Sequence, residues 1–137
     1  MREIFIDTNV IFDLLLGKEP YSTPANNLFQ YSIMNDIVMN ICSLSYATIY
    51  YVLRKKESHE IVLNNLNWLS ILTKCLQVNE NVIQKSLTSN FADFEDAIQY
   101  FCALQTPKCE AIISRDRKGF RLSAIPVMSP NEFLANE

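Results

Sequence analysis

The chain has 137 residues, of which 49% are hydrophobic, with a formal net charge of −3 and only two glycines. This length fits one domain, residues 1–137, with an ample hydrophobic core, and the scarcity of glycine argues against a loop-rich barrel. The acidic balance leaves no overall attraction for nucleic acid, so any polyanion would need a local basic patch or a metal ion.

Strand-like and helix-like segments alternate along the chain. Residues 4–6 predict a buried strand that ends at Asp7, and residues 10–16 predict the helix that follows. After them we expect, in chain order, a helix over 25–35, a strand over 37–42, helices over 43–56 and 58–72, a strand over 75–78, helices over 80–87 and 94–104, strands over 111–113 and 125–127, and a helical turn over 130–134. Strands that alternate with helices require right-handed crossovers, so the pattern predicts an α/β fold with a parallel sheet covered on both faces.

Two of these helices carry more specific expectations. Ser43 or Ser45 is placed to cap the helix over 43–56. The helix over 58–72 is amphipathic, with Ile61 and Leu63 among the residues of its apolar face.

Cysteine spacing and hydropathy indicate the compartment. The four cysteines show no C-x-x-C spacing and are expected to be buried thiols, without a zinc site or a disulfide framework. No stretch resembles a signal peptide or reaches the ~18 apolar residues of a spanning helix. We therefore expect a cytoplasmic protein with no membrane segment.

Asp7 is the first candidate for chemistry, because it stands at the carboxyl end of a predicted buried strand. In open parallel sheets, ligands bind in the crevice outside the strand ends, where loops and helix N-termini converge. An Asp at this position is equally suited to cap the helix that follows. Both interpretations of Asp7 stay open at this point.

Two further acids lie where such a fold would bring them to Asp7. Asp96 is in the first turn of a predicted helix, and Asp116 follows the strand over 111–113. Two unit charges 4 Å apart repel by about 4 kcal/mol at an effective dielectric constant of 20. A cluster of three carboxylates therefore predicts raised pKa values or a bound divalent cation. Mg²⁺ suits such a site, because it takes one or two carboxylates and keeps several waters.

Each acid near the cluster also has a structural interpretation. Asp93 is placed to cap the helix that contains Asp96, and Asp96 to favour the dipole of that helix. Asp116 fits a turn residue. Glu95 is expected to be solvated, and Asp13 to be a structural polar position on the first helix.

A local basic cluster surrounds Asp116 in this acidic chain. It consists of Arg115, Arg117, Lys118 and Arg121. Near a carboxylate–metal centre such a cluster predicts a grip on a phosphate backbone, although a solvated loop explains it equally well. The only histidine, His59, stands at a helix start where we expect it to be exposed, so no Ser-His-Asp or Cys-His system can be built.

Four segments together resemble the PIN-domain family, small metal-dependent nucleases that include the toxins of many prokaryotic toxin–antitoxin pairs. The resemblance covers nearly the whole chain. It is carried by Phe5-Ile6-Asp7-Thr8-Asn9-Val10, Asp93-Phe94-Glu95-Asp96-Ala97-Ile98-Gln99, Ile112-Ile113-Ser114-Arg115-Asp116 and Ile125-Pro126-Val127-Met128-Ser129-Pro130. It implies a three-layer α/β/α sandwich with a central parallel sheet.

The resemblance also implies a chemistry. The acids of the family gather Mg²⁺ or Mn²⁺ to cut RNA, so Asp7, Asp96 and Asp116 would be catalytic metal ligands, with Asn9 and Ser114 as supporting groups. It further implies an RNA substrate, a homodimer, and an antitoxin protein that holds toxin members inactive. No residue of the sequence identifies the target RNA.

The chain departs from the family pattern at two positions. Members commonly carry a Glu in the helix after the second strand, where this chain has Thr48, which we expect to be a supporting polar group. The loop after the strand over 111–113 often reads Thr-Arg-Asn and then Asp-Phe, whereas here Asp116 takes the Asn position and Gly119 the Asp position. Asp93 is a further candidate ligand that would compensate in part. An altered metal site is therefore as consistent with this chain as a fully active one.

Three functions follow from these patterns. The first is a metal-dependent endoribonuclease that hydrolyses RNA phosphodiester bonds, such as the toxin of a toxin–antitoxin pair. The second is a phosphatase of the haloacid-dehalogenase type, which is disfavoured because Asn9 replaces the acid that would act as general acid. The third is a catalytically degenerate PIN domain that acts as a nucleic-acid- or protein-binding module, which metal binding without RNA cleavage would identify.

Overall fold

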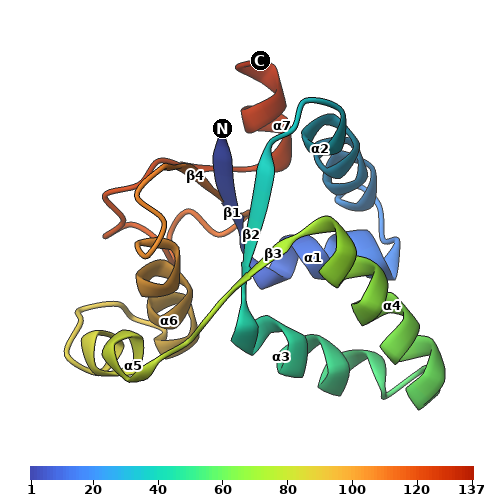
Figure 1. The fold of residues 1–137 in the computed structure, drawn as a ribbon, viewed down its shortest axis with the longest axis horizontal. Coiled ribbons are helices and arrows are strands. Elements are labelled where there is room, and N and C mark those ends of the chain that lie inside the picture. The colour runs from blue at the N-terminus through green and yellow to red at the C-terminus, as the bar shows by residue number, and fades with distance from the viewer.

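The computed structural model describes residues 1–137 (Figure 1). Its elements are β1 (Glu3–Ile6), α1 (Thr8–Leu16), α2 (Ser22–Met34), β2 (Val38–Cys42), α3 (Ser43–Leu53), α4 (His59–Leu72), β3 (Lys74–Leu76), α5 (Glu80–Leu87), α6 (Phe94–Ala103), β4 (Cys109–Ile113), β5 (Val127–Met128) and α7 (Pro130–Ala135). All strands run parallel in one sheet, in the order β3-β2-β1-β4-β5. The first strand of the chain therefore lies at the centre of the sheet.

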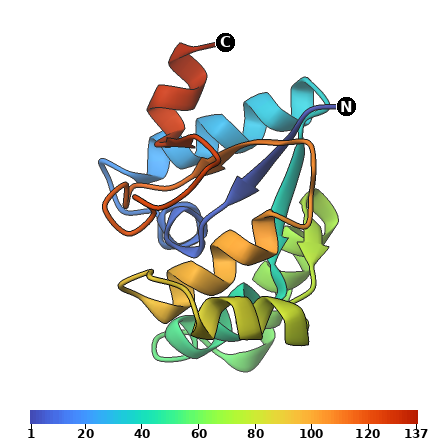
Figure 2. The same cartoon turned by 90° about the vertical axis from the view of Figure 1, so that its left-hand side faces the viewer.

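Helices cover both faces of this sheet, which gives three layers. In Figure 1, α5 and α6 lie on one side of the sheet and α1, α2 and α4 on the other; Figure 2 brings α5 and α6 to the front. Alternate residues of a strand point to opposite faces, so Ile4 and Ile6 belong to one core and Phe5, between them, belongs to the other. The predicted α/β/α sandwich with a central parallel sheet is confirmed.

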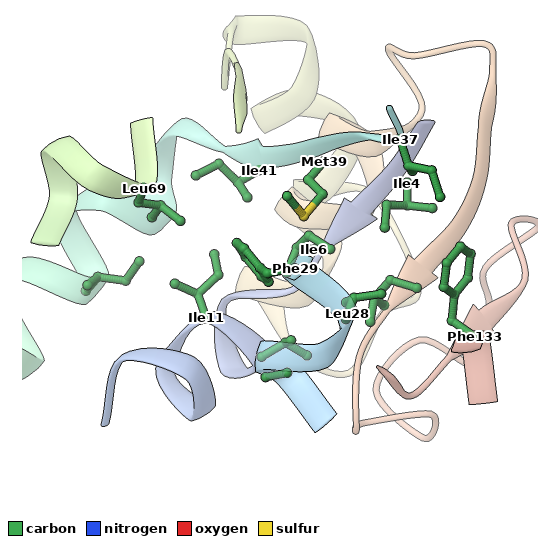
Figure 3. Packing of buried hydrophobic residues seen from close by; sticks show 14 of the residues in the cluster. Ile4, Ile6, Ile11, Leu28, Phe29, Ile37, Met39, Ile41, Leu69 and Phe133 are labelled. Atoms are coloured by element: carbon green, nitrogen blue, oxygen red, sulfur yellow. The ribbon is translucent and has the colours of Figure 1, made fainter. Parts of the chain in front are cut away.

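The larger core packs the central strands against α1, α2, α4 and α7 (Figure 3). Ile6 and Met39 from neighbouring strands lie against Leu28 and Phe29 of α2, and all four are at most 2% exposed. Burial of one such side chain contributes roughly 1.5–3 kcal/mol. This core fixes β1, and with it the residue that follows β1, in a rigid frame.

The start of α3 differs from the expectation. Neither Ser43 nor Ser45 caps the helix, because Cys42 occupies the N-cap position. The hydroxyl oxygen of Ser43 instead accepts a hydrogen bond from the backbone N–H of Val78 (3.1 Å). α3 also ends at Leu53 rather than at residue 56, so the basic residues after it lie in the loop.

α4 buries a narrower face than its sequence predicts. Val62 and Leu69 are buried, whereas Ile61 and Leu63 are 47% and 40% exposed. The apolar residues of α4 are spread around the helix, and only one side of it can face the sheet. α4 therefore presents apolar side chains to solvent.

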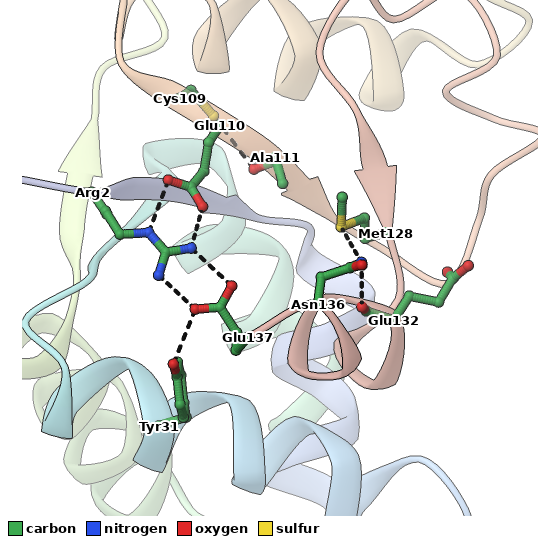
Figure 4. Close-up of polar contacts among 9 residues, drawn as sticks. All are labelled: Arg2, Tyr31, Cys109, Glu110, Ala111, Met128, Glu132, Asn136 and Glu137. Atoms are coloured by element: carbon green, nitrogen blue, oxygen red, sulfur yellow. Dashed lines mark hydrogen bonds and ion pairs between the residues drawn. The ribbon is translucent and has the colours of Figure 1, made fainter.

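A polar cluster joins both ends of the chain at the amino end of the sheet (Figure 4). The guanidinium of Arg2 donates to Glu110 at the start of β4 (2.5 and 3.1 Å) and to Glu137 (2.5 and 2.9 Å). The hydroxyl of Tyr31 also donates to Glu137 (3.0 Å). These contacts hold the C-terminal residues and α2 against β1 and β4, at the sheet edge opposite the carboxyl ends of the strands.

The structure also tests the expectations about the cysteines and about membrane-spanning helices. All four cysteines are free. Cys42 and Cys102 are buried, but Cys109 is only partly buried and Cys75 is exposed, so the expectation of four buried thiols is wrong at these last two positions. No helix combines the length and the apolar character that crossing a membrane requires.

Candidate active site

The topology of the sheet creates a crevice between β1 and β4. From β1 the chain moves outward to β2 and β3, and it returns on the other side of β1 to form β4 and β5. In parallel α/β sheets, ligands bind at such a switch point, outside the carboxyl ends of the strands. Asp7 follows β1 and Ser114 follows β4, and the backbone N–H of Asp7 donates to the carbonyl of Ile113 (2.9 Å). Side chains 107 positions apart thus meet at one place.

Asp7 is buried and held by two side chains. Only 3% of it is exposed. Its Oδ2 accepts from the hydroxyl of Ser114 (2.6 Å) and its Oδ1 from the side-chain amide of Gln99 (2.8 Å). Burial raises the pKa of Asp7, and the hydrogen bonds from Ser114 and Gln99 oppose that rise. Asp7 occupies the N-cap position of α1 without a geometrically well-formed side-chain capping bond, and its two short hydrogen bonds come from side chains of α6 and of the segment after β4.

A pocket of about 300 Å³ opens beside Asp7. Its lining consists of Asp7, Thr8, Asn9 and Phe12 around the start of α1, Thr48 of α3, Asp93, Glu95, Asp96 and Gln99 around the start of α6, and Asp116 after β4. The lining contains five acidic side chains and no basic one. The acids at the ends of β1 and β4 and at the start of α6 therefore share one cavity, as the sequence predicts.

Asp96 lies under a strong negative field. Its pKa is raised to about 7, first by burial and then by the charges of Asp7, Asp93, Asp116 and Glu95. The backbone N–H of Asp96 also donates to the carboxylate of Asp93 (3.0 Å), which caps α6. The structural role expected for Asp93 is confirmed, and its side chain lines the pocket as well.

Gly119 leaves the space that the carboxylates of Asp96 and Asp116 occupy. A Cβ atom at this position would overlap Asp116 Oδ2 and would lie 2.5 Å from Asp96 Oδ2. The backbone N–H of Gly119 donates to Asp116 Oδ1 (2.9 Å). Two carboxylate oxygens from distant segments therefore converge on one point beside a residue that has no side chain.

The pocket fits a hard divalent cation with an incomplete set of protein ligands. No three acidic, histidine or cysteine side chains are arranged to hold one ion together. Mg²⁺ needs only one or two carboxylates and keeps several waters, and Asp96 and Asp116 supply such a pair. Asn9 Oδ1 is buried and has no hydrogen-bond partner, which leaves an oxygen ligand free at the pocket. We conclude that the residues present suit Mg²⁺ or Mn²⁺.

The predicted basic cluster divides into two parts. Arg115 turns away from the pocket, forms two hydrogen bonds with Asp13 (2.6 and 2.9 Å), and stacks on the ring of Tyr21 with its Cζ 3.8 Å from the ring centroid. Together these three residues line part of a separate, larger cavity of about 390 Å³, which contains no carboxylate cluster. The structural role expected for Asp13 is thus observed.

The other basic residues follow on the same loop. Arg117 pairs with Glu132 of α7. Lys118 and Arg121 are exposed and form no ion pair. Of the four basic residues, these two have charges that no acid of the chain neutralises.

Sequence reasoning missed two residues of the site. Gln99 binds Asp7 through its amide N–H, and its carbonyl oxygen accepts from the backbone N–H of Thr8 (3.0 Å). Its position three residues after Asp96 places it on the same face of the helix, which is a signal that could have identified it. Ser45 forms a 2.7 Å hydroxyl–hydroxyl hydrogen bond with Thr8, and so joins α3 to the start of α1.

Glu95 was expected to be solvated, and it is exposed. Its carboxylate nevertheless faces the pocket, where Thr48 Oγ1 lies 3.4 Å from Glu95 Oε1. Thr48 also donates to the carbonyl of Leu44 (3.3 Å). The polar role expected for Thr48 therefore includes a contact with a carboxylate from α6.

The family model for the PIN domain matches residues 3–118 of the chain. The chain belongs to the PIN-domain family. A curated relative of this PIN domain, Ribonuclease VapC1 from Aquifex aeolicus (strain VF5), is 25% identical over 137 residues, which cover 96% of this chain and 93% of the relative.

Solved structures share the fold of this PIN domain at low sequence identity. The FitAB complex bound to the IR36 DNA fragment contains a chain with a TM-score of 0.69 and 16% identity, and the match covers 93% of this chain and 94% of that one. VapC20 of Mycobacterium tuberculosis, described as a toxin that cleaves the sarcin–ricin loop, has a TM-score of 0.68 and 13% identity, with 87% and 94% covered. VapBC2 of Rickettsia felis, bound to a DNA fragment from its promoter, has a TM-score of 0.62 and 11% identity, with 93% and 98% covered. At these identities the likeness shows the fold.

Proposed function

We propose that this PIN domain is a divalent-metal-dependent endoribonuclease that hydrolyses phosphodiester bonds of RNA, as the toxin of a toxin–antitoxin pair. The observation that carries the proposal is the buried carboxylate of Asp7, fixed by Ser114 and Gln99 at the head of a pocket lined by four further acids. Such a cavity attracts a cation and repels a free polyanion. A metal ion would therefore be needed to bring a phosphate group there.

The acids have distinct tasks in this proposal. Asp7, Asp96 and Asp116 would hold the ion, and Asp93 would add charge at the rim. A divalent cation bound there would supply Lewis-acid activation of a phosphate group and of a water molecule. Ser114 fixes the orientation of Asp7 through its hydroxyl group, and the Asn9 side chain offers its unpaired Oδ1.

Recognition of RNA would rest on the metal and on a few backbone contacts. Lys118 and Arg121 lie on the loop that carries Asp116 and have no acidic partner, so they are free to bind phosphates. The names of two relatives support RNA as the substrate, since one is a ribonuclease and the other cleaves the sarcin–ricin loop. By analogy with the FitAB and VapBC2 complexes, we also propose an antitoxin protein as partner. We propose a homodimer as the assembled form on the resemblance of the sequence to the PIN-domain family alone.

One observation favours a second function, a binding module without catalysis. No three metal-ligating side chains are preassembled, and the position where family members commonly carry a Glu is Thr48. In this case the protein would act through a partner or through RNA binding alone.

The deciding experiment is cleavage of a mixed pool of labelled RNAs by the purified protein with Mg²⁺, with Mn²⁺ and with a chelator. The test variant is Asp7→Asn, and the control is Asp36→Asn, at a turn with φ of 54° that Asn also adopts. We expect metal-dependent cleavage by the wild type and the control, and none by Asp7→Asn. Equal cleavage by all three proteins would contradict the proposal, and Mn²⁺ binding without any cleavage would support the binding module.

A further inference from the structure

Glu95 is an exposed residue whose carboxylate faces an acidic pocket rather than the open solvent. It stands in the first turn of α6, next to Asp96, and lines the same cavity as Asp7. Its Oε1 lies 3.4 Å from the hydroxyl oxygen of Thr48 on α3. The side chain therefore reaches from one wall of the pocket to the other.

The hydroxyl of Thr48 steadies this carboxylate without saturating it. Thr48 has one hydroxyl proton, which is shared between Glu95 (3.4 Å) and the carbonyl of Leu44 (3.3 Å), and both distances are long. A carboxylate can accept about four hydrogen bonds. The oxygens of Glu95 thus have free acceptor capacity inside the pocket.

The charge of Glu95 acts on the other acids. Glu95 stands next to Asp96 and lines the same cavity as Asp7, Asp93 and Asp116. No basic side chain lines the pocket to offset this repulsion. A cation is the one species that makes all these charges favourable at once.

Two further observations indicate that this pocket suits a cation. Asn9 Oδ1 is buried without a partner. Gly119 has no side chain to separate Asp96 from Asp116, so oxygens of these two acids approach the same place.

We propose that the carboxylate of Glu95, which Thr48 of α3 orients, provides a negative charge beside the α3 wall of this pocket and strengthens the binding of a divalent cation there. The inference rests on the metal site of the proposed function and extends it to a residue that acts from the outer wall. Glu95 is a positioning residue in this scheme: its free acceptor oxygens would accept hydrogen bonds from waters of a bound cation. Glu95 is on α6 and Thr48 is on α3, so a pair of mutations can move the carboxylate from one helix to the other.

The test is calorimetric titration of the whole protein with MnCl₂, which requires no RNA. Glu95→Gln should weaken Mn²⁺ binding about tenfold, and Thr48→Val less, about threefold. The double variant Thr48→Glu/Glu95→Gln places the acid on α3 instead and should restore affinity to within about threefold of the wild type. The matched control is Glu60→Gln, since Glu60 holds the same first-turn position in α4, is exposed and lies outside the pocket; it should bind Mn²⁺ as the wild type does.

The outcomes separate this inference from the proposed function. If Asp96→Asn abolishes Mn²⁺ binding while Glu95→Gln leaves it unchanged, the metal site stands and the role of Glu95 is rejected. If the wild type binds no Mn²⁺, both proposals fall. If Glu95→Gln weakens Mn²⁺ binding but the double variant does not restore it, a carboxylate beside the α3 wall does not strengthen binding, and the inference is rejected. Thermal unfolding must show that both variants are folded.

Discussion

Ser114 connects Asp7 with Asp116. Its hydroxyl donates to Asp7 Oδ2 (2.6 Å), and its oxygen accepts from the backbone N–H of Asp116 (2.9 Å). One side chain thus orients the buried acid at the end of β1 and holds the loop that carries the acid after β4. The two halves of the pocket are coupled through this hydroxyl group.

Replacing Ser114 by Ala should therefore disturb both halves. We expect Mn²⁺ affinity to fall about tenfold and the free energy of unfolding to fall by about 1–2 kcal/mol, because Asp7 loses a buried hydrogen-bond donor. Calorimetry and urea denaturation measure the two effects. Ser70→Ala is the control, since the Ser70 hydroxyl donates to a carbonyl on the exposed side of α4; equal losses in the two variants would contradict the prediction.

The two glycines allow metal binding and stability to be tested separately. In Gly119→Ala the new methyl group displaces the carboxylate of Asp116 from its position near Asp96, so Mn²⁺ affinity should fall about tenfold with little change in stability. In Gly17→Ala the backbone has φ of 65° and nothing lies near the new Cβ, so stability should fall by about 1 kcal/mol with unchanged Mn²⁺ affinity. If Gly119→Ala lowered stability without changing Mn²⁺ affinity, Gly119 would have no part in the site.

RNA binding should depend on Lys118 and Arg121. In an Asp7→Asn background, which prevents cleavage, Lys118→Gln/Arg121→Gln should reduce the salt-dependence slope of RNA binding by about 1.4, or about 0.7 for each lost phosphate contact on single strands. Fluorescence anisotropy at several salt concentrations measures this slope. Lys55→Gln/Lys56→Gln removes the same charge from the exposed loop after α3 and should leave it unchanged; an equal loss would mean that only net charge matters.

The cluster at the amino end of the sheet predicts a pH dependence of stability. Hydrogen bonds from Arg2 and Tyr31 lower the pKa of Glu137 below its ordinary value of 4.5. A lowered carboxyl pKa stabilises the fold at pH values above the ordinary one, and this contribution disappears as the pH falls through the lowered pKa. The free energy of unfolding of the wild type should therefore exceed that of Glu137→Gln by about 1 kcal/mol at neutral pH. This difference should disappear as the pH falls below 4.5. Denaturation curves from pH 7 to pH 3 test this, and a gap that widens in acid would contradict it.

The positions of the acids could be predicted from the sequence, because strand ends and helix starts fix backbone positions. Asp7 and Asp116 follow buried strands and Asp96 opens a helix, so the parallel fold alone brings them together. The direction of a long side chain is different, since it depends on what stands opposite in the folded state. The approach of Glu95 to Thr48 and of Arg115 to Asp13 joins residues 47 and 102 positions apart, and no local pattern encodes it.

The order of the strands also determines when the pocket can exist. During synthesis, the serine that orients Asp7 is added 107 positions after Asp7 itself. A growing chain on the ribosome therefore carries Asp7 without its partner, and β1 without its neighbour β4, until Ser114 has been added. The pocket cannot assemble before that point, so any chemistry it performs begins only after both halves of the sheet have been synthesised.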